Sequence, residues 1–360
     1  MDIATRIATL CAGAITAQTF PGCVVGYIRE GETVIKGFGR QRYEGSGSPV
    51  DSDTIYDVAS ITKSVVTGSV AMKMVEEGRL NLDDAVAQYV PELTTKYRED
   101  IRVRHLLTYT LAFQIEGGLA AIAKRAPDRV FEEMCKTELV SAPGEQYYYT
   151  NGPAMLLTAI IERSTHEPLD VLARRYFFEP LGMTLSTMHP ELLPRFQIAP
   201  TEIDWRGEVR AEVHDEAAWA MAQHGRIAGD AGLFTTAGDL LKFCQMLIDE
   251  GWVGSKLLLT RETVALMHTN QLNITGEDAG FGWELGWNKA FGDVVSPQAF
   301  GKTGFTGCVI VIDPTKKAAM VHLSNRTYPK RPTSREPIIN FRRALAQIVF
   351  SELPDQQDLS

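Results

Sequence analysis

The spacing of apolar and polar positions changes several times along the 360 residues, and each change predicts a different element. Residues 7–17 have the spacing of an amphipathic helix. Two runs rich in β-forming residues follow, 22–29 and 32–39, and they meet at Glu30-Gly31. Two such β-rich runs, joined by a tight turn, predict a β-hairpin. A helical stretch then begins at Ser60 and continues to about residue 77.

The middle of the chain is mostly helical in pattern, and strand character returns only near its end. Helices are expected over residues 104–110, 127–139, 152–163 and 169–178. Pro143-Gly144 interrupts this pattern, so Tyr149 is expected on a loop. The late β-rich runs are 281–287, 307–312 and 318–323, with a turn at Asp313-Pro314. Residues 336–353 predict a closing helix.

Both ends of the chain therefore combine strands with helices, while the middle is helical. This order favours one sheet-centred domain built from both chain ends, with a helical domain inserted into it. We expect residues 1–78 and 225–360 to form the α/β domain and residues 79–224 to form the mainly helical one.

Composition and charge exclude several classes of protein. The chain is 44% apolar and 22% charged, which is ordinary for a globular enzyme. A net charge of −9 and the lack of a basic run argue against a nucleic-acid partner. No stretch reaches the roughly 20 apolar residues of a membrane helix. Residues 7–17 behind Arg6 only weakly resemble a signal peptide, so we expect a cytoplasmic protein, with secretion as the alternative.

The five cysteines are scattered at Cys11, Cys23, Cys135, Cys244 and Cys308. Their number is odd and no Cys-x-x-Cys pair occurs, which predicts free thiols and neither a disulfide framework nor a zinc site. A metal site around Val213-His214-Asp215, His224 and Asp230 is disfavoured, because the spacing of these residues is irregular. No cofactor is expected.

Three short motifs carry the candidate chemistry, and each occurs once. Their order is Ser60-Ile61-Thr62-Lys63, then Tyr149-Thr150-Asn151, then Lys302-Thr303-Gly304. A helix places residues i and i+3 on one face, so the first motif brings a hydroxyl next to an amine.

A serine hydroxyl becomes an effective nucleophile when a base removes its proton. Lys63 can be that base in its neutral form, which burial and nearby positive charge both favour. The start of its buried helix provides one such charge, and Lys302 could supply a second. Tyr149 offers a phenol for proton relay, and Asn151 can orient the lysine or a substrate amide. The backbone N–H groups of Ser60 and of Phe305, expected on a strand after Gly304, are candidate oxyanion donors.

Each motif also has an ordinary structural explanation when taken alone. Ser60 could cap a helix beside a solvated Lys63. Tyr149 could pack between lobes, and Lys302 could merely begin a strand. The ordered set of three favours catalysis over these alternatives.

With these motifs the chain resembles the class C β-lactamase-like serine hydrolases, which include family VIII carboxylesterases, D-amino-acid peptidases and acyltransferases. The resemblance covers roughly residues 15–326 and includes Phe20-Pro21-Gly22 and Pro180-Leu181-Gly182-Met183. It implies an α/β sandwich, with an antiparallel sheet flanked by helices and an inserted helical domain. It also implies Ser60 as nucleophile, Lys63 and Tyr149 as proton-transfer partners, and Lys302-Thr303-Gly304 facing the substrate.

Two departures from the family pattern bear on the substrate. Leu111-Ala112-Phe113 stands where many relatives have Ser-Gly, which argues against β-lactams. Lys302 stands where many esterase-like relatives have His or Trp, which favours substrates with a carboxylate. The expected substrate is a small ester, amide or β-lactam. Carboxylesterase activity comes first, then β-lactamase or D-peptidase activity, then acyl transfer, and a sensor that is acylated without turnover is the alternative class. The oligomeric state stays open.

Overall fold

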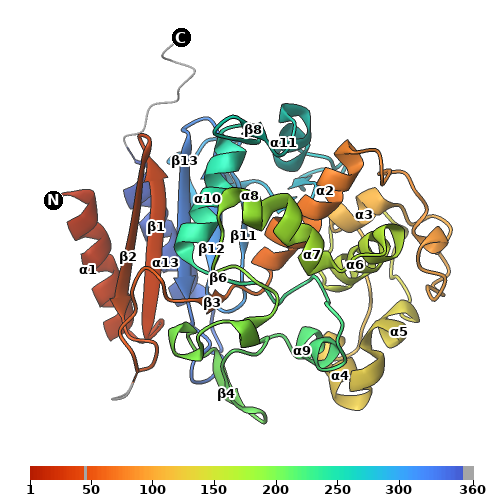
Figure 1. Cartoon of the computed structure of the whole chain (residues 1–360), viewed down its shortest axis with the longest axis horizontal. Coiled ribbons are helices and arrows are strands. Elements are labelled where there is room, and N and C mark those ends of the chain that lie inside the picture. The colour runs from red at the N-terminus through yellow and green to blue at the C-terminus, as the bar shows by residue number, and fades with distance from the viewer. Residues whose placement is uncertain (44–46, 352–360) are drawn as a thin grey trace.

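The computed structural model describes residues 1–43 and 47–351. At its centre lies a 7-stranded antiparallel sheet of order β2-β1-β13-β12-β11-β10-β9, drawn in Figure 1. Its strands are β1 (Gly22–Arg29), β2 (Glu32–Gly39), β9 (Ala279–Gly280), β10 (Trp283–Glu284), β11 (Phe300–Thr303), β12 (Val309–Asp313) and β13 (Ala318–Ser324). The sheet is therefore assembled from both ends of the chain.

Helices cover both faces of this sheet. Helices α1 (Ile3–Thr16) and α13 (Glu336–Phe350) share one apolar cluster with alternate residues of β1, such as Val25. The other face, which carries Val24, packs on α10 (Ala237–Ile248), as Figure 1 shows. Because the central strands are enclosed on both sides, all residues of β12 and β13 are buried. Strand β2 lies at the edge and exposes Lys36.

The rest of the described chain consists of shorter elements, most of them in the middle. The α-helices are α2 (Ser69–Glu76), α3 (Val103–Leu107), α4 (Gly118–Arg125), α5 (Val130–Cys135), α6 (Gly152–Thr165), α7 (Leu169–Ala173), α8 (Glu179–Leu181), α9 (Glu216–Gln223), α11 (Arg261–His268) and α12 (Trp287–Phe291). Two π-helical segments are η1 (Lys63–Gly68) and η4 (Arg174–Phe178), and the 3-10 turns are η2 (Val86–Gln88), η3 (Pro127–Arg129), η5 (Pro190–Leu192) and η6 (Arg195–Gln197). The short strand pairs are β3 (Tyr56–Asp57) with β6 (Phe234–Thr235), β4 (Glu202–Asp204) with β5 (Gly207–Val209), and β7 (Trp252–Val253) with β8 (Lys256–Leu257).

The expected fold class is confirmed: an antiparallel sheet built from both chain ends is flanked by helices, with a largely helical region between. The hairpin at 22–39 has the expected bounds. The closing helix ends at Phe350, and residues 352–353 of its expected span lie outside the described residues. The exact domain boundaries, 1–78 with 225–360 and 79–224, stay a prediction.

Three local expectations were wrong, for identifiable reasons. The expected strand 281–287 is reduced to β10, because Gly282 and Gly286 adopt positive φ of 81° and 72° and Trp287 begins α12. Phe305 does not lie on a strand, since β11 ends at Thr303 and Phe305 occupies the following turn. The expected helix 127–139 ends at Cys135, because Leu139 bridges in extended form to Phe113.

The five cysteine thiols are all free and buried. Those of Cys11 and Cys23 are neighbours, with 3.7 Å between their Sγ atoms. Among the residues described, no helix has both the length and the apolar character that crossing a bilayer requires.

The aromatic cluster beneath α10 provides a test of the core. Phe243 on α10 is fully buried, with ring centroids 5.7 Å from Phe177 and 6.4 Å from Trp283. We expect Phe243→Ala to lower the free energy of unfolding by about 3–5 kcal/mol, because truncation leaves a cavity. Phe196→Ala is the control, since this side chain is 68% exposed, and it should stay within about 0.5 kcal/mol. Urea denaturation of both variants measures the difference, and equal losses would contradict the packing.

Candidate active site

The first motif places the two candidate groups in contact. Ser60 precedes η1 and follows Ala59, which adopts an unusual positive φ of 47°. Lys63, the first residue of η1, is only 2% exposed, and its Nζ lies 3.0 Å from Ser60 Oγ. This distance allows direct proton transfer between hydroxyl and amine.

A segment that the sequence pattern did not single out for this role holds the lysine from the other side. The carbonyl oxygen of Asp230 accepts a hydrogen bond from Lys63 Nζ at 2.7 Å. The two preceding carbonyls are also fixed, since that of Gly229 accepts from Thr67 at 2.6 Å and that of Ala228 from Thr158 at 3.2 Å. A Cβ on Gly229 would lie 1.9 Å from the Thr158 hydroxyl, so only glycine fits there. The segment 228–230 thus fixes the position of the Lys63 side-chain nitrogen.

Lys302 of β11 is also fully buried, and it has its own carboxylate partner. Pairing of Glu284 with Gly301 brings β10 beside β11, and Lys302 Nζ lies 2.7 Å from Glu284 Oε1. The same Nζ lies 4.3 Å and 4.1 Å from the ring centroids of Tyr109 and Tyr149. Burial opposes the charge, but Glu284 and the neighbouring tyrosines raise the pKa of Lys302 well above its ordinary value. Lys302 is therefore a fixed cation between two aromatic rings.

Tyr149 lies on the loop before α6, as expected, and its ring is close to both lysines. Lys63 Nζ is 5.4 Å from the ring centroid. Burial raises the pKa of Tyr149, but Lys302 and Lys63 lower it by more, so the net shift is downward. Tyr109, which interacts with the same cation, has its pKa raised to about 12, chiefly by burial. The two lysines therefore make Tyr149 the more acidic of the two phenols.

The turn after β11 brings Phe305 close to the segment before Ser60. Thr306 donates a hydrogen bond to the Asp57 carbonyl at 2.7 Å, and a Cβ on Gly304 would lie 2.3 Å from the Val58 carbonyl oxygen. Arg342 of α13 donates to the carbonyls of the same turn. Within residues 1–43 and 47–351, neither the Ser60 nor the Phe305 backbone N–H donates a hydrogen bond. Both candidate oxyanion donors are therefore unoccupied by protein acceptors.

Among the described residues, the Asn151 side chain forms a hydrogen bond with neither lysine. Its Nδ2 donates to Asp215 Oδ2 at 3.2 Å, and Asp215 caps α9. Thr303 lies at the end of β11 between Lys302 and Gly304. The described residues contain no group of three or more His, Cys, Asp or Glu side chains that could hold a metal ion.

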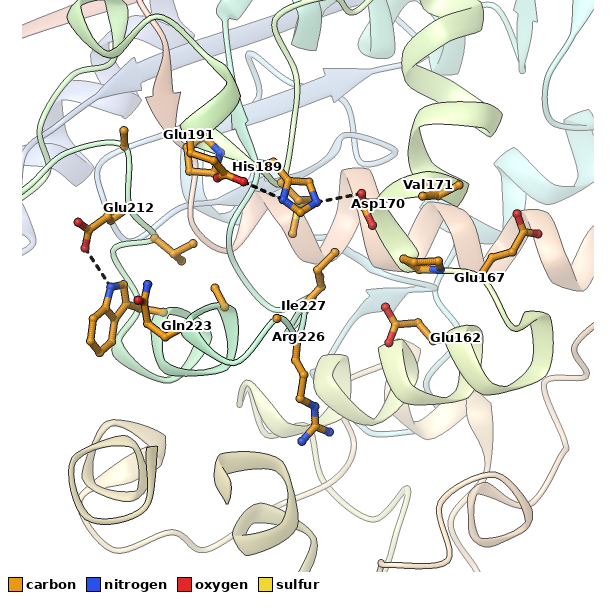
Figure 2. A pocket seen from close by; sticks show the side chains of 18 of the residues that line it. Glu162, Glu167, Asp170, Val171, His189, Glu191, Glu212, Gln223, Arg226 and Ile227 are labelled. Atoms are coloured by element: carbon orange, nitrogen blue, oxygen red, sulfur yellow. Dashed lines mark hydrogen bonds and ion pairs between the residues drawn. The ribbon is translucent and has the colours of Figure 1, made fainter. Parts of the chain in front are cut away.

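A separate cavity of about 1020 Å³ lies away from these residues, and Figure 2 shows it. Its lining includes neither Ser60, Lys63, Tyr149 nor Lys302, and it contains no serine, threonine, cysteine, lysine or tyrosine. The interactions drawn there are those of His189 with Asp170 and Glu191, at 3.1 and 3.2 Å, and that of the Trp219 indole with Glu212. This cavity is therefore not the candidate active site.

Comparison with known proteins identifies the family of the chain. Residues 7–342 match the family described as Beta-lactamase. The chain belongs to the β-lactamase family. A protein of Escherichia coli O157:H7 with the provisional name D-alanyl-D-alanine carboxypeptidase is 32% identical over 352 residues, covering 86% of this chain and 79% of the relative. The homologue in strain K12, with the same name, is also 32% identical, over 80% of this chain and 74% of its own.

Solved structures of this fold are similar along nearly the whole chain. The penicillin-binding protein homologue from Pyrococcus abyssi, described as octameric, has a TM-score of 0.73 and 27% identity, covering 91% of this chain and 75% of its own. EstCE1, described as a hydrolase with promiscuous acyltransferase activity, has a TM-score of 0.77 and 20% identity over 97% and 98%. At that identity EstCE1 supports the fold alone. The family makes this chain a serine hydrolase of the β-lactamase fold.

The buried carboxyl of Asp230 generates a prediction about pH. Its side chain is fully buried, neither oxygen has a hydrogen-bond partner in the described structure, and Oδ2 lies 4.0 Å from Lys63 Nζ. Burial, and then Asp215, raise the pKa of Asp230 from 3.8 to about 7, against the opposing effect of Lys63. The folded chain therefore binds this proton more tightly than the unfolded chain. The stability from this group is complete below pH 3.8 and is lost as the pH rises through about 7.

We expect Asp230→Asn, which cannot ionise, to match the wild type at pH 4 and to be more stable at pH 8. Urea denaturation across this range measures the difference in unfolding free energy. Asp53→Asn is the control, because Asp53 is exposed and the difference should stay flat. A pH-independent difference for Asp230→Asn would contradict ionisation of this carboxyl in the folded protein.

Proposed function

We propose that this protein hydrolyses small esters or amides through an acyl-enzyme on Ser60, with carboxylesterase-like activity as the leading assignment. The observation that carries the proposal is the buried Lys63 amine at 3.0 Å from the Ser60 hydroxyl. An amine at this distance, oriented by the Asp230 carbonyl, supplies the base that a serine nucleophile requires.

In the proposed reaction, Ser60 Oγ attacks the substrate carbonyl while its proton passes to Lys63 or Tyr149. The developing oxyanion accepts hydrogen bonds from the backbone N–H groups of Ser60 and Phe305. Tyr149, whose pKa the two lysines lower, then delivers a proton to the leaving group. Water attacks the acyl-enzyme by the reverse transfer. Lys302 acts by electrostatics on Tyr149, because Glu284 and the aromatic rings enclose it.

A second candidate is hydrolysis of peptides or β-lactams with a D-configured residue. The names of the Escherichia coli relatives support it, since they include D-alanyl-D-alanine carboxypeptidase. Acyl transfer to an acceptor other than water is a third candidate. A panel of p-nitrophenyl esters, a chromogenic cephalosporin and D-amino-acid amides would rank these activities. A sensor that is acylated without turnover would give one stoichiometric burst in place of a steady rate.

Covalent labelling tests the nucleophile. A fluorophosphonate probe should add its mass to the peptide that contains Ser60, because this hydroxyl is next to a base. Ser60→Ala should abolish the labelling, whereas Ser52→Ala, at an exposed serine, should leave it unchanged. Peptide mass spectrometry checks both variants. Undiminished labelling of Ser60→Ala would sink the assignment.

A second variant tests the base. We expect Lys63→Arg to reduce kcat/KM more than about tenfold, because a guanidinium group cannot act as a base and tenfold equals 1.4 kcal/mol. Lys63→Met removes the amine but keeps a side chain of similar length. It should be equally inactive if Lys63→Arg loses activity through the missing base and not through the bulk of arginine. Lys73→Arg on α2 is the control, since this lysine pairs with Glu76 on a partly exposed face. Circular dichroism checks folding, and an active, folded Lys63→Met would rule out lysine as the base.

A further inference from the structure

The Glu284 carboxylate covers the buried ammonium of Lys302. Its Oε1 lies 2.7 Å from Lys302 Nζ, and in the part of the chain that the structure describes Lys302 is the only partner of that carboxylate. The ring faces of Tyr109 and Tyr149 also lie against the ammonium, with centroids at 4.3 and 4.1 Å. The Lys302 side chain is 0% exposed, whereas that of Glu284 is 25% exposed. The carboxylate is therefore the partly exposed end of the ion pair.

The backbone holds this carboxylate beside Lys302. Pairing of Glu284 with Gly301 places β10 directly next to β11, one position before Lys302. The Trp287 indole donates a hydrogen bond to the Glu284 carbonyl at 2.9 Å. A Cβ on Gly301 would lie 2.3 Å from the Ile310 carbonyl oxygen and 3.0 Å from the Trp287 ring, so glycine is required where the strands meet. The sheet thus sets the position of Glu284.

The ion pair lies close to the proposed nucleophile. Lys302 Nζ and Lys63 Nζ lie 4.1 and 5.4 Å from the same Tyr149 ring centroid. Lys63 Nζ is in turn 3.0 Å from Ser60 Oγ. A substrate carbonyl at Ser60 is therefore near enough to interact with the charges of Lys302 and Glu284.

The carboxylate changes what the lysine can bind. A buried lysine without a counter-charge would attract a substrate carboxylate, but the charge of Lys302 is already matched by Glu284. A second carboxylate at Lys302 would have to displace Glu284 from the ammonium or lie beside it, where like charges repel. An uncharged ester meets no such repulsion. The arrangement therefore disfavours anionic groups at this place.

We propose that Glu284 is a specificity-determining residue that closes Lys302 to substrate carboxylates, so that the site accepts esters or amides that are uncharged around the scissile bond. The inference rests on the proposed function, because it concerns the molecule that Ser60 attacks. It favours carboxylesterase activity over carboxypeptidase or β-lactamase activity, since the substrates of those two reactions carry a carboxylate. Specificity of this kind comes from an element that opposes the wrong substrate.

A purely structural ion pair gives a different expectation. If Glu284 only compensates a buried cation, its replacement should weaken the fold and change the activity on all substrates alike. If Glu284 repels substrate carboxylates, the effect of its replacement depends on the charge of the substrate. The comparison of charged and neutral substrates therefore separates the two roles.

Matched esters make this comparison in the full chain. The 4-nitrophenyl hemiglutarate carries a carboxylate on the acyl side, and 4-nitrophenyl butyrate is its neutral counterpart. The 3-carboxyphenyl butyrate carries one on the leaving group, and phenyl butyrate is its neutral counterpart. The measured quantity is the ratio of kcat/KM between the carboxylate ester and its neutral counterpart, because a general loss of activity cancels in this ratio.

We expect Glu284→Gln to raise this ratio about tenfold or more for at least one of the two pairs, because Lys302 then lacks an anionic partner. Glu284→Asp keeps the charge and should keep the ratio within about twofold of the wild type. Glu277→Gln is the matched control: it removes an exposed carboxylate from the segment just before β9 and should leave the ratio unchanged. An unchanged ratio for both pairs in Glu284→Gln, or an equal rise in Glu284→Asp, would overturn the proposal.

Binding to the Ser60→Ala variant separates this inference from the proposed function and does not depend on turnover. In calorimetric titration, adding Glu284→Gln should tighten binding of at least one carboxylate ester about tenfold and leave the neutral esters within about twofold. Adding Lys302→Met as well should remove this gain, because the cation is then absent. Circular dichroism checks that each variant is folded.

The two proposals can fail independently in these experiments. If no ester is hydrolysed but the binding pattern holds, the role of Glu284 in selecting by charge stands and the hydrolase proposal fails. If esters are hydrolysed but Glu284→Gln changes charged and neutral esters alike, the role of Glu284 is refuted alone.

Discussion

The arrangement of the site depends on keeping two lysine side chains out of water within reach of one phenol. Lys63 and Lys302 are 2% and 0% exposed, and both lie within 5.4 Å of the Tyr149 ring centroid. A buried charge is expensive unless fixed dipoles or counter-charges compensate for it. The Asp230 carbonyl does so for Lys63, and the Glu284 carboxylate does so for Lys302. Each compensating group comes from a different part of the fold, so the site requires the assembled structure.

Because the groups that compensate the two lysines come from different elements, the sheet, the helical segments and the loop 228–230 all contribute to the candidate active site. Lys302 is held on β11 by its neighbour β10, which supplies Glu284. Lys63 is held at the beginning of a buried π-helix, an irregularity that is frequent at functional sites. Thr67 of the same π-helix and Thr158 of α6 fix the carbonyls that precede Asp230. Small shifts in any of these elements would change the distance on which proton transfer depends.

The hairpin and the closing helix could be predicted from the sequence, because they depend on local periodicity. The three motifs could be found because the proposed chemistry requires particular residue types at particular spacings. The sequence was insufficient for the groups that act on those motifs. Asp230 is 167 positions from Lys63, and no spacing rule connects them. Glu284 is recognisable only after β10 is paired with β11, and that strand is shortened by two glycines at positive φ. Asn151 fits the expected motif, yet its partner is Asp215, since packing decides which polar groups meet.

The two buried lysines affect the two neighbouring phenols differently. Lys63 and Lys302 are internal and already compensated, so their effect is directed at protons: they lower the pKa of Tyr149 while Tyr109 keeps a raised one. The difference follows from the cations that act on each ring: Lys302 and Lys63 both lower the pKa of Tyr149, whereas burial dominates at Tyr109 and only Lys302 of the two lysines opposes it.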